Sequence, residues 1–167
     1  RYDFSGLNRS RVDGIPSLRA SIANLDAIMP AFEGIDTVVH LSAENQDVNS
    51  WEGNLHINIQ GLRNVYEASR INGVKRIIFA SSGSTTLGPQ YSVSPYKEIA
   101  NAQYDEVEPG WEMIDHRSPY WPVDLYGVCK AFGEVLGRMY ASQYDISVIC
   151  LRIGALLVSD RPEIPRH

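Results

Sequence analysis

Short runs of β-branched and aliphatic residues alternate along this chain with longer segments of helical periodicity. The short runs, which we expect to form buried strands, cover residues 2–7, 36–42, 74–80 and 146–153. The longer segments, which place apolar residues three and four apart, cover residues 24–32, 51–72 and 125–144. Each parallel strand connection needs a crossover, usually a helix. The alternation therefore predicts an α/β fold with a doubly wound parallel sheet and helices on both faces.

The stretch 89–122 interrupts this alternation. It is polar, punctuated by proline and rich in tyrosine and tryptophan, so we expect a long loop with one short helix near residues 96–103. Long loops in compact domains often carry function. The aromatic rings could cover a hydroxylated substrate such as a sugar, form a contact between subunits, or pack the loop itself. All three interpretations remain open at this point.

Composition narrows the choice of partners. The 167 residues suit one domain, and 15 basic against 20 acidic side chains give a net charge of −5. Because no basic patch is visible, we expect a small-molecule partner and no nucleic acid. No apolar run approaches the ~20 residues of a membrane span, so no membrane partner is expected. Cys129 and Cys150 lie in apolar surroundings, which favours buried thiols and a cytoplasmic location, and we predict no metal site.

Tyr126 and Lys130 stand four residues apart in the helical segment 125–144, which places them on one face, one turn apart. A phenol with a pKa of about 10 is a poor base at neutral pH, but a nearby cation favours the phenolate and lowers that pKa. Such a pair could exchange a proton with a substrate hydroxyl. The alternative is a solvated helix face, because this spacing also arises by chance.

A second polar cluster follows the predicted strand 74–80, where the chain continues as Ser-Ser-Gly-Ser-Thr-Thr. Parallel α/β sheets bind their ligands at the carboxyl ends of the strands. A serine here could therefore hydrogen-bond a substrate oxygen beside the Tyr126 phenol. The alternative is a serine-rich turn whose hydroxyls only cap backbone groups.

Five short motifs follow one another along the chain. They are Asp36-x-Val-Val-His-Leu-Ser-Ala43, Asn58-x-x-Gly-x-x-Asn64, Phe79-Ala-Ser-Ser82, Tyr126-x-x-x-Lys130 and Leu151-Arg-Ile-Gly154. In this order they resemble the extended short-chain dehydrogenase/reductases, also called the NAD-dependent epimerase/dehydratase family, and in particular the uronate dehydrogenase branch. The resemblance implies that residues 1–167 form a partial NAD(P)-binding Rossmann-like domain, with an inserted aromatic loop at about 89–122.

The resemblance assigns roles to several side chains. Tyr126 would be the catalytic base, Lys130 would hold the nicotinamide ribose and lower the pKa of the phenol, and Asn58 would help to fix the site geometry. Ser82 would orient the substrate oxygen, although one extra residue in this loop makes Ser84 an alternative. The implied substrate-binding residues, with a free chain end as the alternative for the last, are Ser82, Gly83, Ser84, Tyr126 and Arg166.

NAD or NADP is the cofactor that the resemblance implies. The strand end 40–43 would lie against it chiefly through backbone atoms, which leaves His40 as a packed strand residue. Asn8 and Arg9 replace the acidic residue that usually binds the adenosine ribose, so NADP is as arguable as NAD. Ser21 stands where the family has an aspartate beside the adenine. The implied cofactor-binding residues are Asn8, Arg9, Ser21, Ile22, Leu41, Ser42, Ala43, Ala80, Tyr126, Lys130 and Ile153.

The Gly-rich turn of dinucleotide sites is missing from the sequence, which contains no G-x-G-x-x-G or G-x-x-G-x-x-G. Glycines in that turn let the backbone approach the pyrophosphate. By resemblance, the first strand, this turn and its helix are absent, and so is a C-terminal substrate-binding portion. We therefore interpret the sequence as the middle of a longer enzyme, truncated at both ends.

These features predict an NAD(P)-dependent oxidoreductase that acts on a sugar, a uronate or a related hydroxylated molecule. The alternatives are a nucleotide-sugar epimerase or dehydratase of the same family, and a non-catalytic nucleotide-binding fragment. A dehydratase would need an extra acidic residue beside Ser82, and residues 83–86 offer none. By resemblance, the helices that carry Asn58 and Tyr126 would pair with a second subunit in a homodimer.

Overall fold

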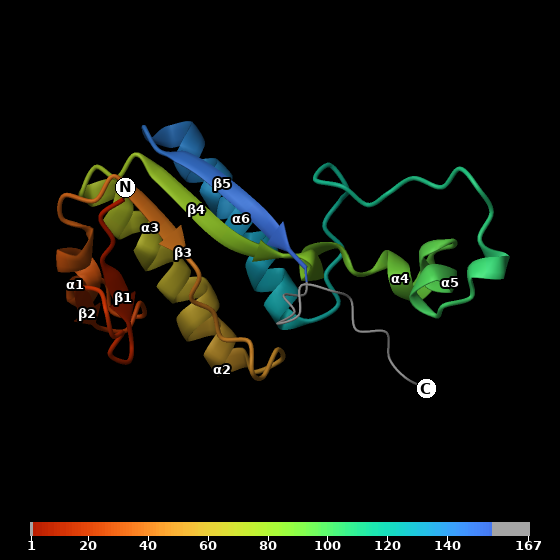
Figure 1. Cartoon of the computed structure of the whole chain (residues 1–167), viewed down its shortest axis with the longest axis horizontal. Coiled ribbons are helices and arrows are strands. Elements are labelled where there is room, and N and C mark those ends of the chain that lie inside the picture. Colours follow the sequence, from red (N-terminus) through yellow and green to blue (C-terminus); the bar gives the residue numbers. More distant parts are fainter. Residues whose placement is uncertain (1, 155–167) are drawn as a thin grey trace.

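Short parallel strands form the two sheets of the computed structural model, which describes residues 2–154 (Figure 1). The strands are β1 (Gly6–Asn8), β2 (Ser17–Arg19), β3 (Thr37–His40), β4 (Arg76–Ser82) and β5 (Ser147–Ile153). β1 pairs with β2, while β3, β4 and β5 form the larger sheet in that order. Every pairing is parallel, which confirms the α/β class predicted from the sequence.

The two-stranded sheet differs in detail from the expectation. The sequence does not predict β2, because three residues after Pro16 are too few to show an alternating pattern. β1 begins later than the predicted strand 2–7. Backbone bonds outside the ladder close the sheet at both ends: the Gly6 amide donates to the Pro16 carbonyl at 2.8 Å, and the Ala20 amide donates to the Asn8 carbonyl at 3.0 Å.

Two long helical segments accompany the larger sheet. They consist of α2 (Trp51–Gly53), the π-helix η2 (Asn54–Gly61) and α3 (Leu62–Ile71), and of α6 (Leu125–Gln143). Both lie where helical periodicity predicts them, but the π-helical stretch is not foreseen. The predicted helix 24–32 divides into α1 (Leu25–Ile28) and the 3-10 turn η1 (Met29–Phe32). It divides there because Pro30 has no backbone N–H to continue an α-helical ladder.

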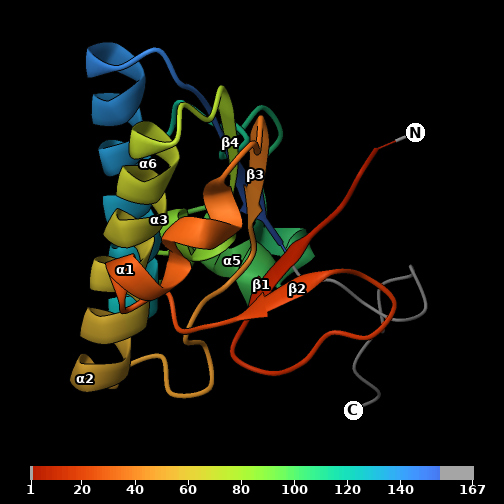
Figure 2. The ribbon, with the colours of Figure 1, turned by 90° about the vertical axis from the view of Figure 1, so that its left-hand side faces the viewer.

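α3 and α6 lie on the same face of the larger sheet (Figure 2). Ile77, Phe79 and Ser81 of β4 are buried, whereas Ile78, Ala80 and Ser82 are half-buried and Arg76 is exposed. The sequence pattern predicts helices on both faces, but these two helices share one. Successive crossovers of one hand that step in one direction across a sheet place their helices on the same side. On β5, Ile149 and Leu151 stay exposed.

Glycines let α6 approach the sheet closely. A Cβ atom on Gly133 would lie 2.5 Å from the Phe79 ring, and one on Gly137 would lie 2.6 Å from the Tyr66 hydroxyl oxygen. Tyr66 and Phe79 belong to the main hydrophobic core, which α3 and β4 share with α6. Any larger residue at either position would push α6, and the functional residues it carries, away from β4.

The stretch 89–122 forms an arm that extends away from the sheets (Figure 1). It contains α4 (Pro89–Ser92), α5 (Tyr96–Ala100) and the 3-10 turn η4 (Tyr104–Glu106). Loop segments connect these elements, and the one short helix predicted near residues 96–103 overlaps α5, whereas α4 and η4 are not predicted. The arm returns to the sheet at Trp121, whose amide donates to the Thr85 carbonyl and whose carbonyl accepts from the Gly88 amide, both at 2.8 Å.

Within residues 2–154, no helix is long and apolar enough to cross a membrane. The same residues contain no group of three or more His, Cys, Asp or Glu side chains placed to hold a metal ion. Cys129 is buried and Cys150 is half-buried, and both are free thiols. The prediction of thiols packed in apolar surroundings therefore agrees with the structure.

Candidate active site

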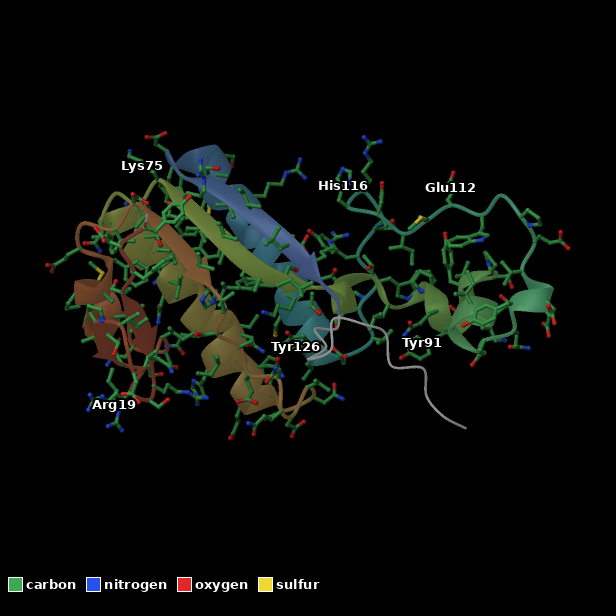
Figure 3. All side chains as sticks on the ribbon, in the orientation of Figure 1. Arg19, Lys75, Tyr91, Glu112, His116 and Tyr126 are labelled. Atoms are coloured by element: carbon green, nitrogen blue, oxygen red, sulfur yellow. The ribbon has the colours of Figure 1, made fainter. Side chains whose placement is uncertain are left out.

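Tyr126 and Lys130 project from the first turns of α6 toward the carboxyl end of β4. Figure 3 shows Tyr126 at this end of the helix, where the arm joins the sheet. Lys130 is only 4% exposed, and its ammonium donates to the Ala80 carbonyl at 2.7 Å. The ammonium nitrogen also lies 4.9 Å from the centroid of the Phe79 ring and 5.4 Å from that of the Tyr126 ring. The pair is therefore not a solvated helix face.

The protonation of this pair departs from the expectation. Burial lowers the pKa of Lys130 to about 8, because desolvation disfavours the charged amine. Burial also raises the pKa of Tyr126, the Asp124 charge adds to that rise, and a hydrogen bond with Ser82 opposes it. We expected the Lys130 charge to lower the pKa of the phenol. The shift instead runs upward, with burial as its largest cause, and the ammonium donates to the Ala80 carbonyl on the strand.

Ser82 ends β4 and begins the 3-10 turn η3 (Gly83–Thr86). Its hydroxyl accepts a hydrogen bond from the Ser84 amide at 3.1 Å and donates to the Ser84 hydroxyl at 3.0 Å. A Cβ atom on Gly127 would lie 2.6 Å from the Ser84 carbonyl oxygen, so η3 packs directly on the start of α6. Of the two serines, Ser82 is the one that influences the pKa of the Tyr126 phenol, which makes it the candidate partner, and its hydroxyl donates to that of Ser84.

Asn58 lies in the π-helix η2, a feature that is often found at functional sites. Its side-chain oxygen accepts from the Glu44 amide, and its nitrogen donates to the Glu44 carbonyl and to the Asn54 side chain, all at 2.8 Å. Both backbone groups of Glu44 are thereby satisfied. Asn58 therefore fixes the loop that follows β3.

Asn54 links the same loop to the catalytic helix, and sequence reasoning misses it. Its side-chain nitrogen donates to the Val48 carbonyl at 3.1 Å and to the Ser50 carbonyl at 2.8 Å. The Val48 carbonyl also accepts from the Tyr126 amide at 3.0 Å. The only signal in the sequence is that Asn54 and Asn58 are four residues apart, which places them on one helix face.

A pocket of about 130 Å³ opens between the two sheets. It is lined by Leu7, Asn8, Arg9, Ala20, Ile22, Ser42, Ala43 and Ile57. Five of these are predicted cofactor-binding residues, so residues from the ends of β1 and β3 that are far apart in the sequence meet here. The predicted adenine partner Ser21 is not among them, because its hydroxyl accepts from the Ala23 amide at 3.3 Å. Leu41 lies next to this wall and is exposed.

Arg9 lines this pocket, and Arg19 lies beside Arg9. The Arg9 amide is bound by the Asn8 side chain at 2.9 Å, and the Arg19 guanidinium donates to the Arg9 carbonyl at 3.0 Å. Sequence reasoning singles out Arg9 but misses Arg19, which the β1–β2 pairing places opposite Asn8. Figure 3 shows Arg19 at the β1–β2 end of the molecule. The exposed Arg9 guanidinium at the pocket, with that of Arg19 nearby, favours an anionic group on the ligand.

A narrow crevice lies against Lys130 beside this pocket. It is lined by His40, Ser42, Asn58, Leu62, Phe79, Cys129 and Lys130, and it shares Ser42 with the larger pocket. His40 is buried, and its ring stacks on Phe79 at 5.9 Å. Burial first, and then the charge of Lys130, lower the pKa of His40 to about 4. His40 is therefore a neutral, packed strand residue, in agreement with the expectation.

The remaining predicted residues lie around these features. Ala80 supplies the carbonyl that holds Lys130, and Ile153 pairs with Ser82 across the β4–β5 ladder. Gly83 and Ser84 form the first half of η3. Arg166 lies outside the described residues.

Comparisons with known proteins agree with this arrangement. The model of the NAD dependent epimerase/dehydratase family matches residues 2–162. L-arabinose 1-dehydrogenase (NAD(P)(+)) of Haloferax volcanii is 34% identical over 160 residues, which cover 95% of this chain and 60% of the relative. Uronate dehydrogenase of Pseudomonas syringae pv. tomato is 33% identical over 134 residues, which cover 80% of this chain and 42% of the relative.

Solved structures give the same picture. Uronate dehydrogenase from Agrobacterium tumefaciens superposes with a TM-score of 0.66 at 31% identity, over 86% of this chain and 48% of that one. Thermus thermophilus UDP-glucose 4-epimerase, a complex with NAD, superposes with a TM-score of 0.65 at 25% identity, over 85% of this chain and 42% of that one. The chain thus spans about half the length of the solved structures that it matches.

Proposed function

The chain belongs to the NAD dependent epimerase/dehydratase family, and from this we propose that it carries the catalytic centre of an NAD(P)-dependent sugar oxidoreductase. The observation that supports the proposal best is the grouping of Tyr126, Ser82 and Lys130 at the carboxyl end of β4. A proton-transferring phenol, a hydroxyl beside it and a cation within one helical turn suit the removal of a proton from a substrate alcohol.

The described residues fit the two ends of a dinucleotide. The pocket beside Asn8 and Arg9 would receive the adenosine end, and the crevice that leads to Lys130 would receive the nicotinamide end. No Gly-rich turn for the pyrophosphate occurs among residues 2–154. When bound, the oxidised nicotinamide would accept a hydride from the substrate carbinol carbon.

In this mechanism Tyr126 moves the proton. Its phenolate oxygen takes the proton of the substrate hydroxyl while Ser82 holds the same oxygen by a hydrogen bond. Lys130, fixed by the Ala80 carbonyl, binds the nicotinamide ribose and supplies positive charge. Because the pKa of Tyr126 is raised, the phenol is protonated at neutral pH, and oxidation of an alcohol should accelerate as pH rises while reduction of a ketone slows.

The substrate class that we propose is a free aldose or a uronate. Relatives with the names arabinose 1-dehydrogenase, glucose-6-phosphate dehydrogenase and uronate dehydrogenase are each at least 33% identical to this chain. Ser82, Ser84 and the Tyr126 phenol offer hydroxyl groups that suit a polyhydroxylated ring. Tyr120 and Trp121 at the base of the arm could cover its apolar face.

The test is a calorimetric titration of the full-length protein with NAD and NADP, followed by absorbance assays with a panel of aldoses and uronates. Binding of one dinucleotide and its stoichiometric reduction by one sugar would support the proposal. Binding without reduction, with conversion of one nucleotide sugar into its epimer, would favour the second candidate, an epimerase, which the likeness to UDP-glucose 4-epimerase supports. No binding would leave a non-catalytic relative.

We further propose that α6 contributes to a homodimer. Val128, Val135 and Met139 stand at intervals of seven and four on this helix, and all three are exposed. Such spacing makes one apolar stripe, which fits a second copy of the same helix. Light scattering after size exclusion should give twice the chain mass, and Val135→Glu should give the monomer. A monomeric wild type would contradict this assignment.

A further inference from the structure

A cluster of one carboxylate, one guanidinium and one phenol lies behind the candidate active site, and the mechanism above does not use it. Glu134 of α6 accepts hydrogen bonds from Arg152 of β5 at 3.1–3.3 Å. Glu134 also accepts from the Tyr120 hydroxyl at 3.2 Å. The guanidinium carbon of Arg152 lies 5.2 Å from the centroid of the Tyr120 ring. We call Glu134, Arg152 and Tyr120 the Glu134 cluster.

The Glu134 cluster holds the last part of the arm against the sheet. Arg152 donates a further hydrogen bond to the Asp115 carbonyl at 3.3 Å, so segment 115–121 is held near both of its ends. Trp121 adds the two backbone bonds to η3. The segment leads directly into α6, where Asp124 accepts from the third amide of the helix and Tyr126 follows.

A fourth contact ties the same carboxylate to the catalytic strand. The Ser81 hydroxyl donates to Glu134 at 2.5 Å. Successive residues of a strand point to opposite faces, so Ser81 turns toward Glu134 while its neighbour Ser82 caps η3. One side chain, Glu134, therefore connects the arm, β5 and the strand end that presents Ser82.

We propose that Glu134 is a positioning residue for the substrate. Through Arg152 and Tyr120 it holds segment 115–121 as one wall of the substrate site beside Ser82. This inference rests on the proposed oxidoreductase function. Glu134 takes no part in the proton transfer. It determines where the sugar binds relative to the Tyr126 phenol.

Burial makes the contacts of Glu134 with Arg152 and Tyr120 difficult to replace. The side chains of Glu134 and Arg152 are 10% and 18% exposed, so the pair is largely withdrawn from solvent. Removing the charge of Glu134 would leave the Arg152 guanidinium partly buried without a counter-charge, which is strongly unfavourable. Burial and then the Glu134 charge also raise the pKa of Tyr120, so its phenol stays protonated and remains a donor.

The chain contains a matched control with the same chemistry. Glu67 of α3 accepts from Arg70 at 2.7 and 3.1 Å and from the Tyr140 hydroxyl at 2.8 Å. Arg70 lies 5.2 Å from the Tyr144 ring, as Arg152 does from Tyr120. These residues lie on α3 and on the last turns of α6, at the opposite end of that helix from Tyr126, so they touch neither the arm nor the strand end.

The test compares Glu134→Gln with Glu67→Gln in the full-length protein. We would measure hydrogen exchange of segment 115–121 by mass spectrometry, the affinity for NAD or NADP by calorimetry, and steady-state kinetics with the best sugar substrate. Both variants should lose some thermal stability. Only Glu134→Gln should accelerate exchange in the segment and raise the KM for the sugar about ten- to hundredfold, as expected for a displaced binding wall. Nucleotide affinity should stay unchanged in both.

Equal KM values for the two variants, or unchanged exchange in segment 115–121, would overturn the inference. If Glu134→Gln does not fold, Tyr120→Phe replaces it in the test, because it removes only one hydroxyl. It should give a smaller increase in hydrogen exchange and in the KM for the sugar. A wild type that oxidises no sugar would refute the proposed function. In that case the exchange measurement alone would still decide whether Glu134 holds the segment.

Discussion

The two ends of the candidate site are held in different ways. At the catalytic end, side chains from α6 and η2 bond to the backbone of other segments: Lys130 donates to the Ala80 carbonyl, Asn58 binds both backbone groups of Glu44, and Asn54 donates to the Val48 carbonyl. At the nucleotide end, two strands of three residues each pair only with one another. The Asn8 side chain bonds to its neighbours Arg9 and Ser10, and both Asn8 and Arg9 remain exposed.

This difference predicts which substitutions should abolish function and which should change it only gradually. A buried polar group that loses its partner leaves a second group unsatisfied, so the cost spreads through the network. An exposed group that is removed leaves water in its place. We therefore expect all-or-none effects at the catalytic end and modest shifts in preference at the nucleotide end.

Tyr126→Phe should give the largest effect. The substitution keeps the ring that packs near Lys130 and removes the only group assigned to proton transfer, so turnover should fall by about 10²–10⁴-fold. Nucleotide affinity, measured by calorimetry, should stay nearly unchanged. Tyr91→Phe, at an exposed tyrosine on the arm (Figure 3), is the matched control and should behave as wild type. Turnover of Tyr126→Phe at the wild-type rate would refute the assigned base.

The free energy of unfolding at low pH should report the burial of His40, which lies close to Lys130. Its pKa is about 4 in the fold against 6.5 for an exposed histidine, so the unfolded chain binds the proton first. Stability is therefore complete above pH ~6.5 and is lost as pH falls through about 4, by up to about 3 kcal/mol at ~1.36 kcal/mol per pKa unit. Urea unfolding at pH 7 and pH 4.5 measures this loss.

His40→Gln should lose less stability between those two pH values than wild type, because glutamine does not titrate. His56→Gln, at an exposed position on η2, should retain the full loss. If His40→Gln and wild type lose the same stability between pH 7 and pH 4.5, other groups cause the loss. His40 would then not be a buried, neutral histidine.

The catalytic end was also the easier one to predict from sequence. Tyr126, Lys130 and Ser82 lie in regular elements, so helical spacing and the end of a β-branched run are enough to bring them together. The sequence could not reveal that Lys130 is directed at the Ala80 carbonyl, because that contact spans fifty residues of chain. Spacing alone predicts a lowered pKa for Tyr126, whereas burial in the fold raises it.

Features that depend on pairing between distant segments could not be predicted. β2 has too few residues for a pattern, so the sequence does not indicate that its pairing with β1 brings Arg19 beside Arg9. The Glu134 cluster joins three elements, and no spacing links Tyr120 to Arg152. The stretch 89–122 was recognised as a long loop because it lacks periodicity, but its return to the sheet depends on Trp121 and η3.

Two equally buried asparagines allow the catalytic end and the nucleotide end to be compared directly. Asn58 fixes the catalytic loop, whereas Asn64, on the same helical segment, donates to the Ile22 carbonyl at the nucleotide pocket at 2.9 Å. Replacing either with Ala should cost about 1–3 kcal/mol of stability, because a buried partner is left unsatisfied. Asn58→Ala should lower kcat, while Asn64→Ala should change nucleotide affinity instead. The same kinetic defect in both variants would remove the distinction between the ends.

The smallest effect should come from the rim of the nucleotide pocket. Arg9 lines the pocket, and its guanidinium is free to meet an adenosine phosphate, whereas Arg11 in the same loop is paired with Asp13 at 3.1 Å. Arg9→Ala should therefore lower the preference for NADP over NAD by about tenfold, the worth of one exposed charge-assisted contact. Arg11→Ala should leave that ratio unchanged. Calorimetry with both dinucleotides measures the ratio directly, and a change of equal size in the two variants would show that net charge, not a contact at Arg9, selects the cofactor.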